Sequence, residues 1–164
     1  MALMIGASGL LNDTSLAIAS VYFRYYLYQA LNMAGFGNDY LNWLGIWKQN
    51  LEMGLTTWAE MDDVNRSRSD YHAWGSSPNI ELYRIVLGID DYAPGFSKVK
   101  IEPHLGALTN ASGTMPHPKG DIKAAYVLAN GKWNIDINLP ASITGKFVWK
   151  DKTFPLKTGK KNYS

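Results

Sequence analysis

The chain has 164 residues, of which 46% are hydrophobic and 18% charged, a composition that excludes intrinsic disorder and predicts one or two small domains. It contains no cysteine, which excludes disulfides, thiolate metal sites and a cysteine nucleophile, and no apolar run reaches the ~20 residues of a membrane span. The aromatic share of 13% suits core packing and also carbohydrate binding, in which a flat ring covers the apolar face of a sugar.

The net charge of +2 hides an uneven distribution along the chain. Residues 1–93 hold five Lys/Arg and ten Asp/Glu, a net −5, whereas residues 94–164 hold eleven Lys and four Asp/Glu, a net +7. A basic half can indicate a nucleic-acid partner, but this half contains no arginine, the usual reader of phosphates and bases. Most of its lysines stand singly along apparent strands, which predicts solvated strand edges and no nucleic-acid surface.

The opening segment, Met1 to Leu11, is apolar and Gly-rich but lacks the basic region of a signal peptide. We interpret it as the start of a fragment, and the cellular location stays open. Residues 14–34 contain neither Gly nor Pro and place apolar residues at helical spacing. They predict a first helix that Asn12 or Asp13 caps and that ends at Gly35.

Two further helices are predicted. The second runs from Asn38 to Gly54, and the third starts at Ser77-Pro78, with the serine as cap, and ends at Gly88. The apolar stripe of the second helix comprises Tyr40, Trp43, Leu44, Trp47 and Leu51. Because three helices cannot bury all their apolar faces on one another, we expect more helices on the N-terminal side.

After Pro94 the apolar pattern changes to a period of two. Short strands are predicted at residues 98–101, 121–128, 133–139 and 146–149, and Asn130-Gly131 predicts a hairpin turn. The chain is therefore predicted to be α+β, with a helical segment over residues 1–93 and an antiparallel β-sandwich over residues 94–164.

Residues 55–76 predict a long polar loop held by Trp58 and Trp74, and such loops are usually functional. Glu60 follows Trp58 closely, so loss of hydration should raise its pKa and make it a general base near neutral pH. The alternative is a solvated acidic loop. An ion pair between Glu60 and Arg66 or Arg68 would argue against the catalytic role.

His72 could donate a hydrogen bond to a substrate hydroxyl, or it could be a buried histidine that Asp70 satisfies. One histidine among several acids does not match the ligand spacing of a zinc or calcium site, so neither a metal nor another cofactor is predicted. His104 and His117 have no carboxylate-rich surroundings and are interpreted as structural.

Several segments together resemble the C-terminal region of bacterial α-L-rhamnosidases of glycoside hydrolase family 78. These are GLTTWAE at 54–60, RSDYHAW at 68–74, YRIVLGI at 83–89, APGF at 93–96 and VKIEP at 99–103. The resemblance covers nearly the whole chain. It implies that the helices close an (α/α)6 barrel and lead into a C-terminal β-sandwich.

The resemblance also implies an inverting glycosidase, in which one carboxylic acid protonates the leaving oxygen and a carboxylate activates water. Glu60 matches the general base, while His72, Trp74 and Trp58 match substrate-binding positions. Tyr71 departs from the family, where a smaller residue such as Cys is expected, which affects the packing of the loop. The general acid is expected outside this chain, so the chain alone should be inactive.

The implied partners are a rhamnose-containing carbohydrate and the missing N-terminal part of the same protein, with no nucleic acid and no membrane. Two other interpretations stay open. One is a glycosidase or phosphorylase of another family with an (α/α)6 barrel and a sandwich. The other is a non-catalytic carbohydrate-binding or structural module, which should bury its own helix stripes.

Overall fold

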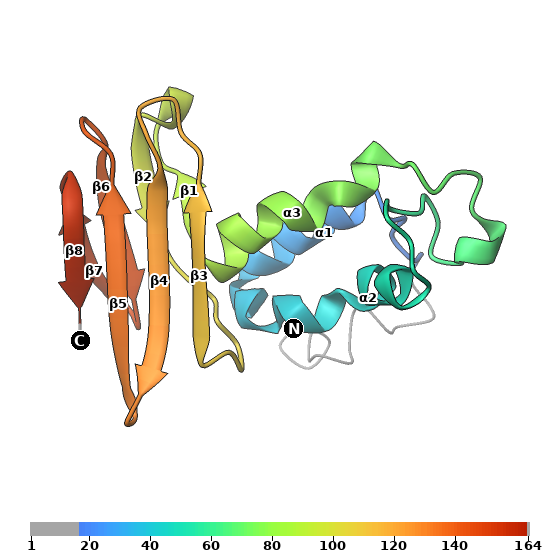
Figure 1. Ribbon diagram of the computed structural model, residues 1–164, viewed down its shortest axis with the longest axis horizontal. Helices are drawn as coiled ribbons and strands as arrows, with labels where there is room; N and C mark the ends of the chain where they lie inside the picture. Colours follow the sequence, from blue (N-terminus) through green and yellow to red (C-terminus); the bar gives the residue numbers. More distant parts are fainter. Residues whose placement is uncertain (1–16, 164) are drawn as a thin grey trace. The chain divides into compact units, whose positions relative to one another are not determined.

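The computed structural model describes residues 17–163, and these form two compact units that divide between Asn79 and Ile80. The first unit consists of helices and loops, and the eight strands of the described chain lie in the second (Figure 1). The predicted class, helices followed by a β-sandwich, is confirmed. Within the described residues, no helix has the length and apolar character needed to cross a membrane.

The first helix begins later than predicted. α1 spans Arg24–Leu31 and continues as a π-helical turn, Asn32–Phe36, in which Gly35 takes a positive φ of 91° as expected for a helix end. The predicted caps Asn12 and Asp13 lie outside the described residues, and residues 17–20 are not helical. The Arg24 guanidinium donates a hydrogen bond of 3.2 Å to the carbonyl of Ala19, which precedes the helix.

The predicted second helix is two elements. A 3₁₀ segment, Gly37–Trp43, stops at Leu44, and α2, Gly45–Glu52, follows it. Its end at Gly54 is confirmed by a φ of 77°. Of the predicted stripe, Tyr40, Trp43 and Trp47 are buried, Leu44 is half-buried and Leu51 is exposed.

The aromatic core of the first unit joins α1 to the segment that follows it. The Tyr28 ring lies 5.2 Å from the Trp43 ring and 5.9 Å from the Tyr40 ring, centroid to centroid. The Tyr28 hydroxyl donates a hydrogen bond of 2.9 Å to the Trp43 carbonyl, which satisfies the one polar group of a fully buried side chain. These contacts fix the scaffold that carries the loop of residues 54–76.

The third helix agrees with its prediction at its C-terminal end. α3, Ser77–Glu81, continues as a π-helical segment, Leu82–Val86, and Gly88 ends it with a φ of 71°. α3 also begins at the predicted position, and a 3₁₀ turn, Ala73–Ser76, precedes it directly. The buried Ser77 hydroxyl makes no hydrogen bond and is therefore not a cap.

The second unit is a sandwich of two four-stranded sheets. One sheet has the order β1-β2-β6-β7, with β1 Ile89–Asp91, β2 Lys98–Ile101, β6 Thr144–Trp149 and β7 Lys152–Leu156. The other has the order β3-β4-β5-β8, with β3 Asn110–Met115, β4 Ile122–Ala129, β5 Lys132–Leu139 and β8 Gly159–Tyr163. β3, β4 and β5 run side by side in the second sheet (Figure 1).

The predicted strands at 98–101, 121–128, 133–139 and 146–149 are β2, β4, β5 and β6, and the Asn130-Gly131 hairpin is confirmed by positive φ at both residues. All pairings are antiparallel except that of β2 with β6. At this parallel pair Gly145 approaches the Val99 carbonyl so closely that a Cβ atom would lie 1.8 Å from the oxygen.

The core of the sandwich comes from the inward sides of strands β1 to β7 and from Ile143, which directly precedes β6. Its fully buried members include Val99, Ile101, Ile122, Tyr126, Ile137, Ile143 and Phe147. β1 lies N-terminal to Pro94 and pairs with β2 in register, Ile89 opposite Ile101. The division of the chain at residue 93 into a barrel segment and a sandwich domain stays a prediction.

Candidate functional site

Two buried anchors position the loop of residues 54–76 on α2. The Asn50 side chain accepts a hydrogen bond of 2.9 Å from the Ala59 backbone N–H, and Asn50 is almost fully buried. The Trp47 indole N–H donates a bond of 2.6 Å to the Gly75 carbonyl. One anchor therefore holds the residue before Glu60, and the other holds the residue after Trp74.

Within the loop, two stretches of backbone lie against each other. The Glu60 N–H donates to the Ser69 carbonyl and the His72 N–H donates to the Trp58 carbonyl, both at 2.9 Å. The Thr57 hydroxyl donates to the Asp70 carbonyl. This pairing brings the segment of Glu60 beside the segment of His72, although twelve positions separate them in the sequence.

Glu60 forms a bidentate ion pair. The Arg68 Nε donates to Oε2 at 3.2 Å, and the Arg68 Nη2 donates to Oε1. Side-chain exposure is 20% for Glu60 and 81% for Arg68. The ion pair that would argue against a catalytic base is thus present, and Arg68 is the residue that pairs with Glu60.

The expected rise in the pKa of Glu60 is wrong. The hydrogen bond from Arg68 lowers this pKa below its usual value, and the charges of Arg68 and His72 act in the same direction. Loss of hydration raises the pKa of Glu60, but this effect is smaller than that of the hydrogen bond. Glu60 is therefore held in its ionised form.

The neighbouring acids have partners of their own. Asp62 pairs with Arg24 of α1 at 2.7 Å, and the Asp63 carboxylate accepts a bond of 3.0 Å from the Asn65 N–H. A cavity of about 330 Å³ lies beside them, lined by residues 18–21, 60–63 and 66. Glu60 thus borders a space that the segment before α1 also lines.

His72, Trp74 and Trp58 are brought together in the same loop. The His72 and Trp74 rings meet edge to face with centroids 5.6 Å apart. His72 is half-buried, whereas Trp74 is 67% exposed. Trp58 packs over Gly75, where an added Cβ would lie 3.0 Å from the Trp58 Cβ, so only glycine fits there without a shift.

Asn50 is a positioning residue that the sequence analysis missed. It lies three positions after Trp47, on the stripe that α2 buries. A polar residue at a buried stripe position must find a hydrogen-bond partner, and here the partners are the Ala59 N–H and the Ile46 carbonyl. This break in the apolar stripe was the available signal.

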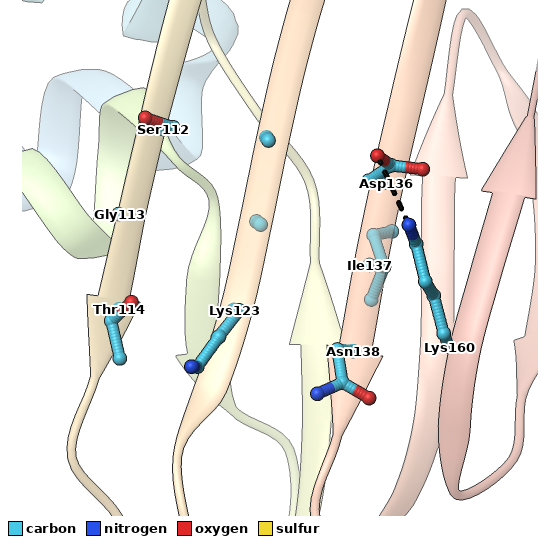
Figure 2. A pocket seen from close by; sticks show the side chains of 10 residues that line it. Ser112, Gly113, Thr114, Lys123, Asp136, Ile137, Asn138 and Lys160 are labelled. Carbon is cyan, nitrogen blue, oxygen red and sulfur yellow. Dashed lines mark ion pairs between the residues drawn. The ribbon is translucent and has the colours of Figure 1, made fainter.

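A second hollow, of about 460 Å³, lies on the second unit, on one face of the β3-β4-β5-β8 sheet. Figure 2 shows Ser112 and Thr114 on β3, Lys123 on β4, Asp136 and Asn138 on β5, and Lys160 on β8. Lys160 pairs with Asp136 at 3.6 Å. Because its lining includes no aromatic ring and its charged groups are exposed, this face has the character of a solvated sheet surface.

His117 makes structural side-chain contacts, and His104 is half-buried. A ring nitrogen of His117 lies 3.2 Å from the Phe96 carbonyl, and the ring meets Phe96 edge to face. Burial lowers the pKa of His104. Across residues 17–163, no three His, Asp or Glu side chains converge as the ligands of a metal ion would.

Comparison with known proteins assigns the sandwich to a family. Residues 88–164 match the family described as bacterial alpha-L-rhamnosidase C-terminal domain. A 68-residue stretch is 33% identical to an alpha-L-rhamnosidase of Alteromonas sp. (strain LOR), and it covers 41% of this chain and 7% of that protein. The chain thus spans a small part of its relatives' length.

Solved structures of α-L-rhamnosidases share the fold of this chain. The GH78 family rhamnosidase of Bacillus sp. GL1 has 29% identity and a TM-score of 0.72, covering 80% of this chain and 15% of that one. The alpha-L-rhamnosidase of Aspergillus terreus has 19% identity and a TM-score of 0.76, covering 86% and 18%. Residues 88–164 therefore belong to the bacterial alpha-L-rhamnosidase C-terminal domain family, and the chain resembles a C-terminal fragment of such an enzyme.

Proposed function

We propose that the chain completes the active site of an inverting α-L-rhamnosidase, to which it supplies the general base Glu60. In this role residues 1–93 are the closing helices of an (α/α)6 barrel, and residues 94–164 are the sandwich that follows it. The substrate is a rhamnose-containing carbohydrate, and the partner is the remainder of the same enzyme, which supplies the general acid.

The observation that carries the proposal is the pairing of two loop segments. Hydrogen bonds from Glu60 to Ser69 and from His72 to Trp58 hold a carboxylate, an imidazole and two indole rings on one short stretch of loop. A carboxylate can activate water, an imidazole can hydrogen-bond a sugar hydroxyl, and an indole can cover an apolar sugar face. The family resemblance gives these residues the same roles.

The proposed reaction is a single displacement. Glu60 accepts a proton from water while the water oxygen forms a bond to the anomeric carbon. The bond from this carbon to the glycosidic oxygen breaks, and the general acid gives its proton to that oxygen. The two carboxyl groups of such a pair stand about 6.5–9.5 Å apart to leave room for the water.

The ion pair with Arg68 restricts this proposal without removing it. A carboxylate offers about four acceptor positions, and the bidentate guanidinium uses two of them, which leaves a lone pair on each oxygen for water. Because Arg68 is mostly exposed, water screens its attraction to Glu60. The lowered pKa keeps Glu60 unprotonated, as a base must be, but also makes it a weaker base.

The test is the Glu60→Gln substitution in the complete rhamnosidase. We expect turnover of a rhamnoside to fall by about 10²–10⁴-fold, because water activation is lost, while rhamnose binding by calorimetry stays close to that of the wild type. Asp63→Asn is the matched control, since this neighbouring carboxylate bonds only within its own turn. Full turnover of Glu60→Gln would remove Glu60 from the mechanism.

A further inference from the structure

Four exposed aromatic side chains form one continuous surface in the first unit. Tyr22 and Phe23 lie in the turn just before α1, Tyr26 lies in its first turn, and Trp74 lies in the loop of residues 54–76. Tyr22 has its ring centroid 5.7 Å from that of Phe23, 5.8 Å from that of Tyr26 and 5.3 Å from that of Trp74. We call these four residues the aromatic surface.

The four rings of the aromatic surface contact one another and still remain exposed to solvent. Relative exposure is 37% for Tyr22, 59% for Phe23, 50% for Tyr26 and 67% for Trp74. Single exposed apolar residues are common on proteins. A group of adjacent exposed rings is instead typical of a binding surface. In this chain, these four rings are therefore open to solvent.

The surface is amphipathic, because it combines ring faces with hydroxyl groups. The Tyr22 and Tyr26 hydroxyls lie 3.2 Å apart in an exposed hydrogen bond. Each hydroxyl keeps further donor or acceptor capacity. Apolar faces edged by hydroxyls suit a sugar, which presents C–H groups on one face of its ring and hydroxyls around its edge.

The position of the aromatic surface indicates which sugar it would contact. Trp74 touches Tyr22 on one side and His72 on the other. His72 in turn lies on the segment that pairs with the segment of Glu60 through backbone hydrogen bonds of 2.9 Å. The aromatic surface thus extends directly from the residues proposed to hold the rhamnose.

We propose that Tyr22, Phe23 and Tyr26, together with Trp74, form a stacking surface for the saccharide unit to which the cleaved rhamnose is attached. This inference rests on the proposed function, because it takes the loop of Glu60 and His72 as the rhamnose site. It assigns selectivity for the leaving group to Tyr22, Phe23 and Tyr26. The family resemblance gives these three residues no role.

The test compares two rhamnosides with the complete enzyme, methyl α-L-rhamnoside and a rhamnosyl-glucose disaccharide. Tyr26→Ala should lower the ratio of kcat/KM for the disaccharide to kcat/KM for the methyl rhamnoside about tenfold, because only the disaccharide reaches the ring. Phe23→Ala should lower this ratio similarly. Tyr26→Phe, which keeps the ring, should restore it to within about twofold of the wild type.

Met33→Ala is the matched control, because Met33 is an exposed apolar residue of the same helical segment outside the aromatic surface. It should leave the ratio unchanged. If the rings instead cover another part of the enzyme, Tyr26→Ala and Phe23→Ala will lower Tm and reduce both activities equally, and this outcome overturns the inference. An unchanged ratio, or no hydrolysis of the disaccharide by the wild type, overturns it as well.

Failure of the proposed function would be recognised separately. If Glu60→Gln keeps full turnover while Tyr26→Ala changes the ratio, the aromatic surface binds the leaving group and a different residue is the base. If Glu60→Gln is inactive and the ratio does not change, the base is correct and the inference about the aromatic surface is wrong.

Discussion

Asn50 and Ala59 are joined by a hydrogen bond of 2.9 Å from the Ala59 N–H to the Asn50 side-chain oxygen. Asn50 is 1% exposed, and its amide nitrogen donates to the Ile46 carbonyl at 2.8 Å, so both ends of the amide are satisfied inside the unit. A buried residue of α2 thereby fixes the backbone one position before Glu60.

Substitution Asn50→Ala should therefore affect both stability and activity. It leaves the buried Ala59 N–H without an acceptor, which should lower the free energy of unfolding by about 1–3 kcal/mol. In the complete enzyme we expect kcat to fall more than rhamnose affinity, because the carboxylate loses its fixed position. Urea denaturation and steady-state kinetics measure the two effects, and wild-type values for both would contradict the assigned role.

The ion pair of Glu60 with Arg68 predicts a change in pH dependence. Arg68→Ala removes the hydrogen bond that lowers the pKa of Glu60, so this pKa should rise. Because the base acts in its ionised form, the acidic limb of the kcat/KM profile should move to higher pH. Arg66→Ala is the control within the same loop. A fall in the plateau rate without movement of the limb would show that Arg68 positions Glu60 and does not tune it.

The chain by itself should not cleave rhamnosides, because the proposed mechanism needs a general acid that another part of the enzyme supplies. Incubation of the purified chain with an aryl rhamnoside, followed by chromatography of the products, tests this expectation. Release of rhamnose that the Glu60→Gln variant abolishes would place both catalytic groups in this chain.

Two glycines of the sandwich should differ in their tolerance of a methyl group. A Cβ at Gly145 would lie 1.8 Å from the Val99 carbonyl oxygen, whereas a Cβ at Gly113 would meet the Leu87 side chain at 2.4 Å. A backbone carbonyl within a ladder cannot move aside, but a leucine methyl can rotate. We expect Gly145→Ala to lower the free energy of unfolding by more than about 3 kcal/mol, and Gly113→Ala by about 1–3 kcal/mol. Equal losses in thermal unfolding would contradict this order.

The sequence predicted those parts of the fold that local chemistry determines. Gly54 and Gly88 end helical segments with a positive φ, and the alternating strands around Asn130-Gly131 form the hairpin of β4 and β5. β3 was missed because its sequence, NASGTM, has no apolar alternation, and its half-buried positions are the small residues Ala111 and Gly113. Gly113 packs against Leu87, a long-range contact that no local sequence pattern indicates.

The candidate site was predicted less completely. The loop and its residues Glu60, His72, Trp58 and Trp74 were named from composition and resemblance, but the pKa of Glu60 was predicted in the wrong direction. Arg66 and Arg68 are equivalent in the sequence, and only the folded loop decides that Arg68 is the partner. At the start of α1, the Arg24 guanidinium bonds Ala19 and Asp62, and the sequence likewise does not indicate these partners.

The parallel pairing of β2 with β6 has a consequence for the order in which the sandwich folds. Val99 lies beside Gly145 and Ile101 beside Phe147, and the strands β3, β4 and β5 all lie between them in the chain. Closing so long a stretch is entropically costly, so the β4–β5 hairpin should assemble first and the β2–β6 contact late and slowly. During synthesis, the sheet that contains β1 and β2 can therefore form only after β6 and β7 have left the ribosome.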